Sequence, residues 1–451
     1  MRWRVIAVAA AAASVAGVQP AEAAGFALRE QSASGLGGAF AGMSAGGDDI
    51  SAMFFNPAVT TRTSGNSVAT AISVIAPQSK IRGASGSTIT GSPITGGNGG
   101  SDVADDVVLP AFYALWDLDR TFNVGYKLRF ALGVNTPFGL ETDYNDGWVG
   151  RYHALQTKLS TINVNPTIAF QPVPGLSLGA GLQLQYADAK LTNAVDFGTI
   201  GAVSGIPGAA PGLQDGRARV TGDDWSYGFT LGALVEPWSG TRVGVGYRSK
   251  IEHTLRGRAS FRLDDAGVGA ALSGATGAFT NTDAQATITT PESVNLGVYQ
   301  ALGARWALSG EAQWTRWSQF KDLTIKFANP AQPDSFTDDD WNDTWFFAVG
   351  VTYRPTDAWT LRAGYAYDQS PVPNKTRSPR IPDNDRHWLA LGASYRPLPN
   401  LLLAIGYTHI FVRDADIDLS AAAPGETFRG NFSGKAETSI DIVSVQAELR
   451  F

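Results

Sequence analysis

Side chains that could carry out catalysis are few and scattered. The four histidines are His153, His253, His387 and His409, and the chain has no cysteine, which excludes a thiolate nucleophile or thiolate metal site. A hydrolase needs a serine, a histidine and a polar orienting residue brought together. His409 is the only candidate base, but it shares an alternating face with Tyr407 and has no serine beside it. The histidines therefore give no sign of an enzyme.

One acidic run, DDDWND, extends from Asp338 to Asp343. Carboxylates this dense suit a divalent cation, although a solvated loop is the simpler interpretation. No pattern indicates a cofactor or the use of ATP, and a net charge of -6 gives no electrostatic reason to expect nucleic acid. The sequence thus predicts a protein that is not an enzyme, with no cofactor and no resident metal.

The N-terminus has the form of a secretory signal peptide. Arg2 and Arg4 precede an apolar stretch from Val5 to Val18, which is too short to span a bilayer. Small residues follow, as signal peptidase requires, and we expect cleavage after Ala23. Residues 1–23 are therefore the signal peptide, and the mature protein leaves the cytoplasm.

The remaining chain alternates between apolar and polar residues. At its C-terminus, Val443, Val445 and Leu449 alternate with Ser444 and Glu448, and a period of two indicates strands. Short and long connections also alternate along the chain. Short turns occur at 117–120, 172–175, 236–240, 301–304, 354–358 and 396–400. Long loops lie near 83–106, 139–157, 192–216, 261–283, 327–341, 371–384 and 420–435. This arrangement predicts about fourteen antiparallel strands.

An even number of strands with short turns on one side and long loops on the other is typical of a bacterial outer-membrane barrel. In lipid every strand edge must be paired, so the sheet must close. Aromatic residues fall at two depths, as the two headgroup regions favour. They are Tyr353, Trp359, Tyr395, Trp238 and Phe451 near the short turns, and Tyr186, Tyr367, Trp314 and Tyr407 further along. We expect an all-β transmembrane barrel over residues 66–451, in the outer membrane, with both termini periplasmic.

Residues 24–65 do not alternate. They are rich in Gly, Ala and Ser and contain apolar clusters, among them Phe26, Leu28, Phe54 and Phe55. A barrel of about fourteen strands is too wide for its own side chains to fill. This segment is the right size to plug it, and it is too apolar for a solvated tail. We therefore predict an N-terminal hatch inside the lumen.

Several motifs make the chain similar to a known family. They are the mature start AGF, the run SGLGGAFAG, the pair Asp48–Asp49, FFNPA with its triplet Asn56-Pro57-Ala58, TPFGL after the third strand, GWVGRYHAL, and the terminal Phe451. Together they resemble the FadL/TodX family of outer-membrane transporters for long-chain fatty acids and other hydrophobic compounds. The resemblance covers essentially the whole mature chain. It implies passive uptake through a surface site and an internal site beside the hatch, in a monomer surrounded by outer-membrane lipid.

Parity along the strands selects charges that face the lumen. The cations expected there are Lys127, Arg129, Arg248, Lys250 and Arg362, and the acids are Glu252, Glu311, Asp368 and Glu448. A fatty acid needs an apolar slot and one or two cations, which these residues and Phe26, Phe54 and Phe55 could supply. The alternative is that the cations pair with the acids and with the hatch.

The long loops are unusually apolar. The 139–157 loop contains Trp148 and Tyr152, and the 192–216 loop is mostly Ala, Gly, Val, Ile and Pro. Such loops could form a capture groove, or they could pack on one another.

The resemblance further implies an inward kink in the third strand that opens the wall sideways. Gly125 and Gly133 lie in that strand region, and glycine permits a bend there. Two other functions are weighed against uptake of hydrophobic molecules: a general polar porin, which the hatch argues against, and a structural or adhesive barrel without transport. The sequence does not choose between fatty acids and aromatic or alkane substrates.

Overall fold

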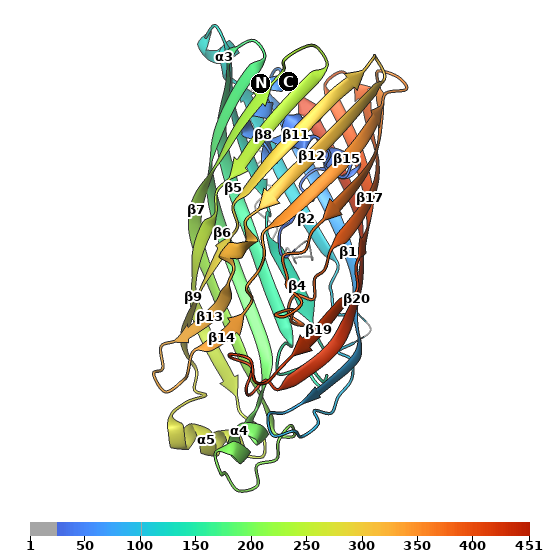
Figure 1. Ribbon diagram of the computed structural model, residues 1–451. Coiled ribbons are helices and arrows are strands. Elements are labelled where there is room, and N and C mark those ends of the chain that lie inside the picture. The colour runs from blue at the N-terminus through green and yellow to red at the C-terminus, as the bar shows by residue number, and fades with distance from the viewer. Residues whose placement is uncertain (1–24, 101) are drawn as a thin grey trace.

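A computed structural model describes residues 25–100 and 102–451, so the expected signal peptide lies outside the described residues. The chain forms a tall closed barrel (Figure 1). Twenty strand segments make fourteen antiparallel wall strands, because six strands are each interrupted once. The last segment pairs with the first from Ser67↔Arg450 to Ser87↔Asn431, which closes the sheet. The predicted fold class and strand number are confirmed.

The strand segments follow the order of the chain around the barrel. They are β1 Ser67–Ser87, β2 Val107–Asp117, β3 Lys127–Asn135, β4 Gly139–Asp143, β5 Gln156–Val173, β6 Leu176–Asp196, β7 Asp215–Val235, β8 Thr241–Arg248, β9 Ile251–Arg262, β10 Thr282–Thr290, β11 Ser293–Leu302, β12 Trp306–Thr315, β13 Asp322–Phe327, β14 Ser335–Asp338, β15 Thr344–Tyr353, β16 Trp359–Asp368, β17 Arg386–Leu398, β18 Leu401–Val412, β19 Ala415–Leu419 and β20 Asn431–Arg450.

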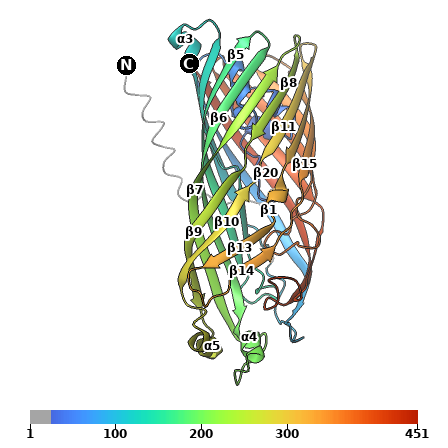
Figure 2. The same cartoon turned by 60° about the vertical axis from the view of Figure 1, so that its left-hand side comes forward.

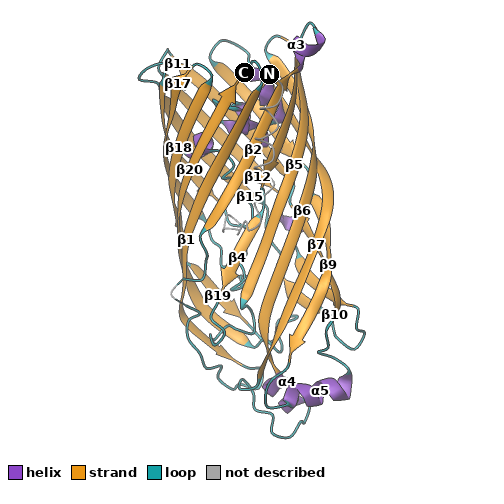
Figure 3. Cartoon of the chain, turned by 180° about the vertical axis from the view of Figure 1, so that it is seen from behind, coloured by secondary structure: helices purple, strands orange, loops and turns teal. Residues whose placement is uncertain are grey.

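Short helices occur in two settings. Inside the barrel are α2 Ala33–Leu36, η2 Met43–Ala45, η3 Ile50–Phe54 and η4 Pro57–Arg62; in connections are α3 Leu118–Phe122, α4 Phe197–Val203, α5 Val268–Thr276 and η5 Trp317–Gln319. In the described part of the chain, no helix has the length and apolar character needed to cross a bilayer. Figure 3 shows the first group inside the upper half of the barrel and α4 and α5 below its opposite rim.

The two faces of the wall differ as the alternation predicts. Large apolar side chains are exposed on the outside, whereas polar side chains such as Gln183, Asn295 and Glu448 are buried on the inside. On β7 the exposed aromatic Trp225 and the end of the strand at Val235 are ten residues apart, which corresponds to a band about 25 Å tall on a tilted strand. The outer surface thus suits a bilayer.

The N-terminal segment fills the lumen near the short-turn rim, so the hatch is present as predicted. Its backbone touches the wall directly, because many wall residues that face it are glycines. A Cβ atom added to any of them would lie within 2.7 Å of a hatch atom: Gly179, Gly232, Gly244, Gly246, Gly297, Gly364, Gly392 and Gly406. We name these eight residues the glycine ring. No other residue permits so close an approach of two backbones.

The third wall strand is broken at Thr136, Pro137 and Phe138. Its segment on the short-turn side, β3, pairs with β2 as far as Phe112↔Val134, whereas β5 is the one partner strand of β4 among the described residues. The register against β5 shifts by one residue between Asn135↔Asn163 and Gly139↔Ser160, which is a β-bulge. The half of β2 toward the long loops has no partner strand on this side among the described residues, and it contains Pro110, which has no N–H to donate.

Candidate substrate-binding site

An inner cavity lies between the hatch and the wall. Its empty space amounts to about 690 Å³, including the part open to solvent. The hatch supplies Ala27, Leu28, Arg29, Phe54 and Phe55, and the broken strand supplies Pro137 and Phe138. The rest of the wall and its loops supply Arg248, Pro291, Ser293, Asn295, Gln313, Thr315, Trp317, Thr344, Asp368 and Trp388. Aromatic rings and polar groups therefore share one lining.

Two arginines bring positive charge to the inner cavity. Arg248 donates from Nη2 to the Phe54 carbonyl at 3.0 Å, bonds to Gln183, and lies 4.5 Å from the centroid of the Phe54 ring. Arg29 lies 3.7 Å from the centroid of the Phe346 ring. Within residues 25–100 and 102–451 no ion pair or hydrogen bond is formed by the Arg29 guanidinium, although the carboxylate of Asp368 lines the same cavity. With one acid against two cations, the lining is net positive.

Polar atoms without partners also line this cavity. Among the described residues, Trp388 Nε1, Asn295 Oδ1 and Gln313 Oε1 are buried and make no hydrogen bond. Buried polar groups normally find partners: the two amide oxygens need a donor, such as a water or a hydroxyl, whereas Trp388 Nε1–H needs an acceptor. Trp388 Nε1–H is a donor, like the two guanidiniums, and can serve a carboxylate.

The hatch is joined to the broken strand beside this cavity. Ala27 forms an isolated antiparallel bridge with Phe138. Leu28 N donates to Pro137 O at 2.8 Å, and Gly139 N donates to Phe26 O at 2.9 Å. The hatch therefore supplies the backbone partners that β2 would supply to an unbroken strand. Movement of one element must disturb the other.

A second, outer cavity lies on the loop side of Phe26. Its empty space amounts to about 700 Å³, including the part open to solvent. Its apolar lining comprises Phe26, Leu140, Leu159, Ala189, Leu191, Val220, Leu255, Ala284, Ala286, Ile288, Phe320, Leu323, Ile325 and Ile381. Phe26 packs against Trp317 of the inner cavity with ring centroids 4.6 Å apart. Phe26 thus separates an apolar vestibule from a mixed polar site.

The residues predicted to bind substrate divide into three groups. Phe54, Phe55 and Arg248 meet in the inner cavity, and Phe26 lines the outer one. Their role in binding stays a prediction, but the structure places them in two neighbouring cavities.

Trp148 and Tyr152 lie elsewhere. Each is only 1% exposed and lies in a packed cluster of loop side chains, where Trp148 stacks on Tyr144 with ring centroids 4.1 Å apart. Neither residue lines the inner or the outer cavity. The alternative that these loops pack on one another therefore describes them better than a capture groove does.

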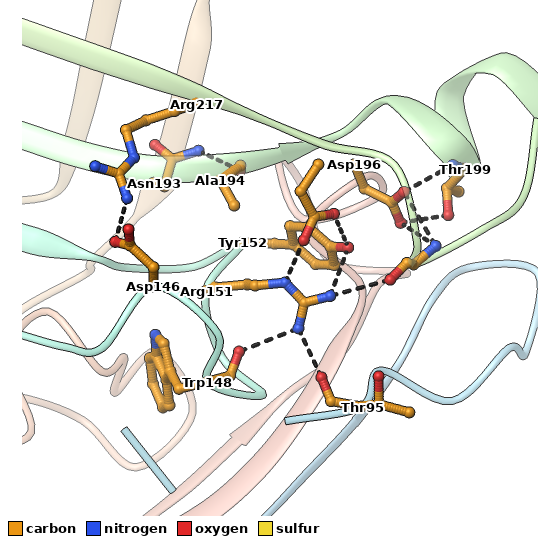
Figure 4. A network of polar contacts seen from close by, with 12 residues as sticks. Thr95, Asp146, Trp148, Arg151, Tyr152, Asn193, Ala194, Asp196, Thr199 and Arg217 are labelled. Atoms are coloured by element: carbon orange, nitrogen blue, oxygen red, sulfur yellow. Dashed lines mark hydrogen bonds and ion pairs between the residues drawn. The ribbon is translucent and has the colours of Figure 1, made fainter. Parts of the chain in front are cut away.

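Figure 4 shows the polar network that holds these loops together. Arg151 donates to Asp215 Oδ2 at 2.6 Å, to Thr95 O at 2.9 Å and to Gly212 O at 3.0 Å. The Tyr152 hydroxyl donates to Asp215 Oδ1 at 2.5 Å. One buried guanidinium thus ties three loops to one another.

The inward cations nearer the short turns hold the hatch. Arg129 Nε donates to Thr63 O at 3.0 Å, and Arg129 also pairs with Asp117 at 3.0 Å. Arg362 pairs with Asp48 of the hatch. These contacts match the alternative to substrate binding, in which the cations of the lumen pair with acids and with the hatch. Of the predicted acids, Glu311, Asp368 and Glu448 are buried.

Two predicted inward residues point out of the barrel. Arg248 and Ile251 are both buried, so Ser249 and Lys250 between them contain one residue more than alternation allows. This irregularity between β8 and β9 shifts the parity along β9. Lys250 and Glu252 are consequently exposed, and the prediction for them was wrong. Lys127 keeps the parity of Arg129 but is exposed at the first position of β3.

The Asn56-Pro57-Ala58 triplet anchors the end of the hatch to the wall. Asn56 Nδ2 donates to Ser44 O at 2.7 Å and to Ala233 O of β7 at 2.9 Å. Its Oδ1 accepts from Ala58 N at 3.0 Å and so caps η4, with proline in the first turn. The side chain is fully buried. The motif joins two hatch segments and one wall strand.

The expected positions of the kink are not where the strand breaks. Gly125 is exposed before β3 begins, and Gly133 is paired on both sides, with Tyr113 and with Asn165. The break starts at Thr136, one residue beyond the end of β3, where Pro137 cannot donate to a neighbouring strand. The TPFGL segment was therefore the better indicator.

Sequence reasoning missed Arg29, Trp317 and Trp388. Parity along strands could not select Arg29, because the hatch does not alternate. One signal was nevertheless present: Arg29 is the only arginine or lysine between residues 24 and 61. A lone cation in an apolar plug marks a place where an anion could bind.

Comparison with known proteins agrees with this geometry. Residues 13–451 match the model of the outer membrane protein transport protein family (OMPP1/FadL/TodX). The chain is 30% identical over 421 residues to the long-chain fatty acid transport protein of Escherichia coli K12, covering 88% of this chain and 87% of the relative.

Solved structures show the same architecture. A Pseudomonas aeruginosa FadL homologue superimposes with a TM-score of 0.87 at 28% identity, covering 95% of this chain and all of the other. The Pseudomonas putida toluene transporter TodX, at 16% identity and a TM-score of 0.64, covers 94% of this chain and 99% of its own and shows the shared fold alone. The chain is therefore an outer-membrane β-barrel that belongs to the OMPP1/FadL/TodX family of transport proteins.

Proposed function

We propose that this transporter takes up long-chain fatty acids or closely similar amphiphiles with one carboxylate. The inner cavity carries the argument. Arg29, Arg248 and Trp388 Nε1 offer three donors, of which Arg29 and Trp388 are unpartnered within the described residues. Leu28, Phe54, Phe55 and Phe138 offer an apolar slot beside them. An alkane or an aromatic hydrocarbon would leave these donors unsatisfied.

The path begins in the outer cavity, whose apolar lining suits the hydrocarbon tail, and passes Phe26 to the inner cavity. Diffusion down the concentration gradient suffices, and one chain encloses the whole path. A polar porin fits this lumen poorly because the hatch fills it on the short-turn side. An adhesive barrel would have no use for two neighbouring cavities, one of them lined by cations.

We propose that the substrate leaves sideways through the break in the third strand. Pro137 and Phe138 line the inner cavity. Among the described residues β4 does not pair with β2, and on that side it is held only by Gly139 N–Phe26 O at 2.9 Å and Asp143 N–Val103 O at 3.0 Å. Each CH₂ group kept out of water is worth roughly 0.8 kcal/mol, so a tail of about sixteen carbons would lose on the order of 10 kcal/mol in an aqueous exit. An exit into the bilayer avoids this loss.

The carboxylate site can be tested with two variants, Arg29→Gln and Arg248→Gln. Binding of palmitate to the purified barrel should weaken about tenfold in each, because a charge-assisted hydrogen bond contributes about 1.5–3 kcal/mol. Binding of hexadecanol should change little. Lys250→Gln is the matched control, since it removes an exposed cation off the path. Equal losses for palmitate and hexadecanol would refute a carboxylate site.

The lateral exit can be tested by locking the hatch to the wall. Ala27 and Phe138 are bridge partners, and such residues approach within disulfide range. The chain has no other cysteine, so Ala27→Cys with Phe138→Cys gives one defined cross-link. Oxidation should stop uptake while palmitate still binds, and reduction should restore uptake. The control pair is Ala301→Cys with Ala307→Cys, which joins β11 to β12. Uptake that continues through the oxidised barrel would rule out this route.

A further inference from the structure

A group of basic side chains projects outward from one flank of the barrel, at the end where the long loops lie. In Figure 2 this flank, formed by β7, β9, β10 and β13, faces the viewer. Its cations are Lys190, Arg217, Arg219, Arg256, Arg258, Arg262 and Lys326. On β9 the arginines alternate with Leu255 and Ala259, which are buried, so the arginines face away from the lumen.

The register places these cations next to one another across the strands. Arg217 is opposite Arg262, and Thr221 is opposite Arg258, which puts Arg219 on the diagonal of Arg258. Side chains two residues apart on neighbouring strands remain within reach of each other when they are long. Like charges in such positions repel unless an anion lies between them.

A hollow lies between two of these arginines. It is lined by Arg219, Thr221, Arg258, Ala259, Ser260 and Asn281. Two guanidiniums, two hydroxyls and one amide thus surround it, and the lining contains no carboxylate. Arg219 makes no side-chain ion pair within the described residues, and Arg258 comes only within 3.9 Å of Asp283, with both side chains more than three-quarters exposed.

The acids of this flank balance only part of the positive charge around the hollow: Asp283 on β10 is opposite Arg258, 3.9 Å away, and Asp223 is opposite Arg256. Asp188 and Asp223 are opposite each other, closer to the aromatic Trp225 than Arg219 is. Asp322 is on β13, and Asp146 pairs with Arg217. The wall formed by β18, β19 and β20 has the contrary balance. There Glu437, Asp441 and Asp414 form ion pairs with Arg82, His409 and Lys435. Asp416 and Asp418 add two more exposed acids.

The height of the hollow relative to the aromatic belt indicates which layer of the membrane it contacts. Trp225 and Tyr227 are 64% and 76% exposed on β7 and mark the outer headgroup region. Arg219 and Thr221 are six and four residues further along β7, so the hollow lies about 10–15 Å beyond that belt. Hydrocarbon does not reach this level, whereas the phosphorylated sugars of an outer-leaflet glycolipid do.

We infer that this hollow binds a phosphate of a phosphorylated outer-leaflet glycolipid. Arginine forks match phosphate oxygens in pairs, and the hydroxyls of Thr221 and Ser260 can donate to the remaining oxygens. The acyl chains of the same lipid would lie against the exposed Trp225 and Tyr227 below. The protein would thus bind an outer-leaflet glycolipid on the flank formed by β7 and β9, and this binding would not depend on transport.

The test compares three barrels in phosphatidylcholine nanodiscs: wild type, Arg219→Gln with Arg258→Gln, and the control Arg82→Gln with Lys435→Gln. The control removes two outward cations that are already paired with Glu437 and Asp414. The probe is bisphosphorylated lipid A, with dephosphorylated lipid A beside it. Wild type and control should bind the bisphosphorylated form equally, and the Arg219/Arg258 variant about thirtyfold less tightly, since each of the two basic groups near an anionic surface is worth about 1 kcal/mol.

Three results would overturn the inference: equal binding by the variant and wild type, an equal loss in the control, or displacement of lipid A by inorganic phosphate at millimolar concentration. The last result would show a site for free anions. Assembly is checked by heat-modifiable gel mobility. If the glutamine variant fails to assemble, Arg219→Lys with Arg258→Lys keeps the charge and loses the paired geometry, and it should weaken binding by a smaller factor.

Discussion

The side-chain amide of Gln31 pairs with the backbone of Thr136. Gln31 Nε2 donates to Thr136 O at 2.7 Å, and Thr136 N donates to Gln31 Oε1 at 3.3 Å. Thr136 is the first residue of the break in the third strand, and Gln31 is a fully buried hatch residue. The hatch thus supplies to the broken strand the two hydrogen bonds that a neighbouring strand would make.

Gln31→Met should therefore loosen the break. The substitution keeps the length of the side chain and removes both hydrogen bonds, leaving two buried backbone groups unsatisfied at about 1–3 kcal/mol each. We expect a faster initial rate of fatty-acid uptake with unchanged barrel assembly. Gln78→Met, at an exposed outward position on β1, should leave the rate unchanged. A rate that does not rise in Gln31→Met would mean that this contact does not limit opening.

Asn56→Ala and Pro57→Ala should impair uptake without preventing assembly. Asn56→Ala removes the bonds to Ser44 O and Ala233 O and the cap on η4, which should destabilise the hatch by about 2–4 kcal/mol. Pro57→Ala should cost less. Heat-modifiable gel mobility reports assembly, and substrate uptake reports function. Wild-type uptake in both variants would remove the triplet from the mechanism.

Gly246→Ala should displace the hatch while leaving the wall intact. A Cβ atom there would lie 1.9 Å from Phe55 O, and Phe55 lines the inner cavity. Gly310→Ala is the matched control, because its Cβ would meet nothing closer than Ala348 O at 3.8 Å. We expect rapid proteolysis of the hatch in folded Gly246→Ala and protection in Gly310→Ala. Equal protection would show that the hatch can shift without loosening.

Asp339 should make the outer loops sensitive to pH. Burial raises the pKa of Asp339 to about 7, helped by Asp338 and Asp322 and opposed by Arg380 and Arg429. The folded loop holds this proton up to about pH 7, whereas an unfolded aspartate releases it near pH 4. The loop's stability against opening therefore falls as pH rises between these values.

Asp339→Asn should abolish this dependence. At pH 8 we expect the loop between β14 and β15 to be cleaved about tenfold more slowly in the variant than in wild type, and at pH 4 equally. Asp340→Asn, at an exposed neighbouring position, controls for the lost charge and for the protease's own pH profile. A pH profile of Asp339→Asn that matches wild type would show that the aspartate remains charged.

Alternation and connection length were sufficient to predict the barrel, its fourteen strands and its hatch, because both follow from the requirement to pair every strand in lipid. Local irregularities were not predictable in this way. One extra residue at Ser249 and Lys250 reverses the parity of Glu252, and the residue types in this segment give no sign of the irregularity. The break at Thr136 was placed too early because glycine, rather than Pro137, was taken as its cause.

The candidate site was predicted in part for a similar reason. Arg248 and Phe54 were found because one obeys strand parity and the other stands in an apolar cluster. Arg29 obeys no periodicity. Trp148 was misplaced because its neighbours, among them Phe432 with ring centroids 5.4 Å away, come from distant parts of the chain.

Because of the glycine ring, the inner surface of the wall must match the shape of the hatch backbone closely. Wall and hatch meet at eight glycines on seven strand segments, so the wall has no side chain at these positions that could move to absorb a misfit. A hatch grafted from a relative would seat only in a wall whose bare positions coincide with its own bends. Redesign of substrate preference in this protein must therefore change the hatch and the wall together, or be limited to side chains that project into the two cavities.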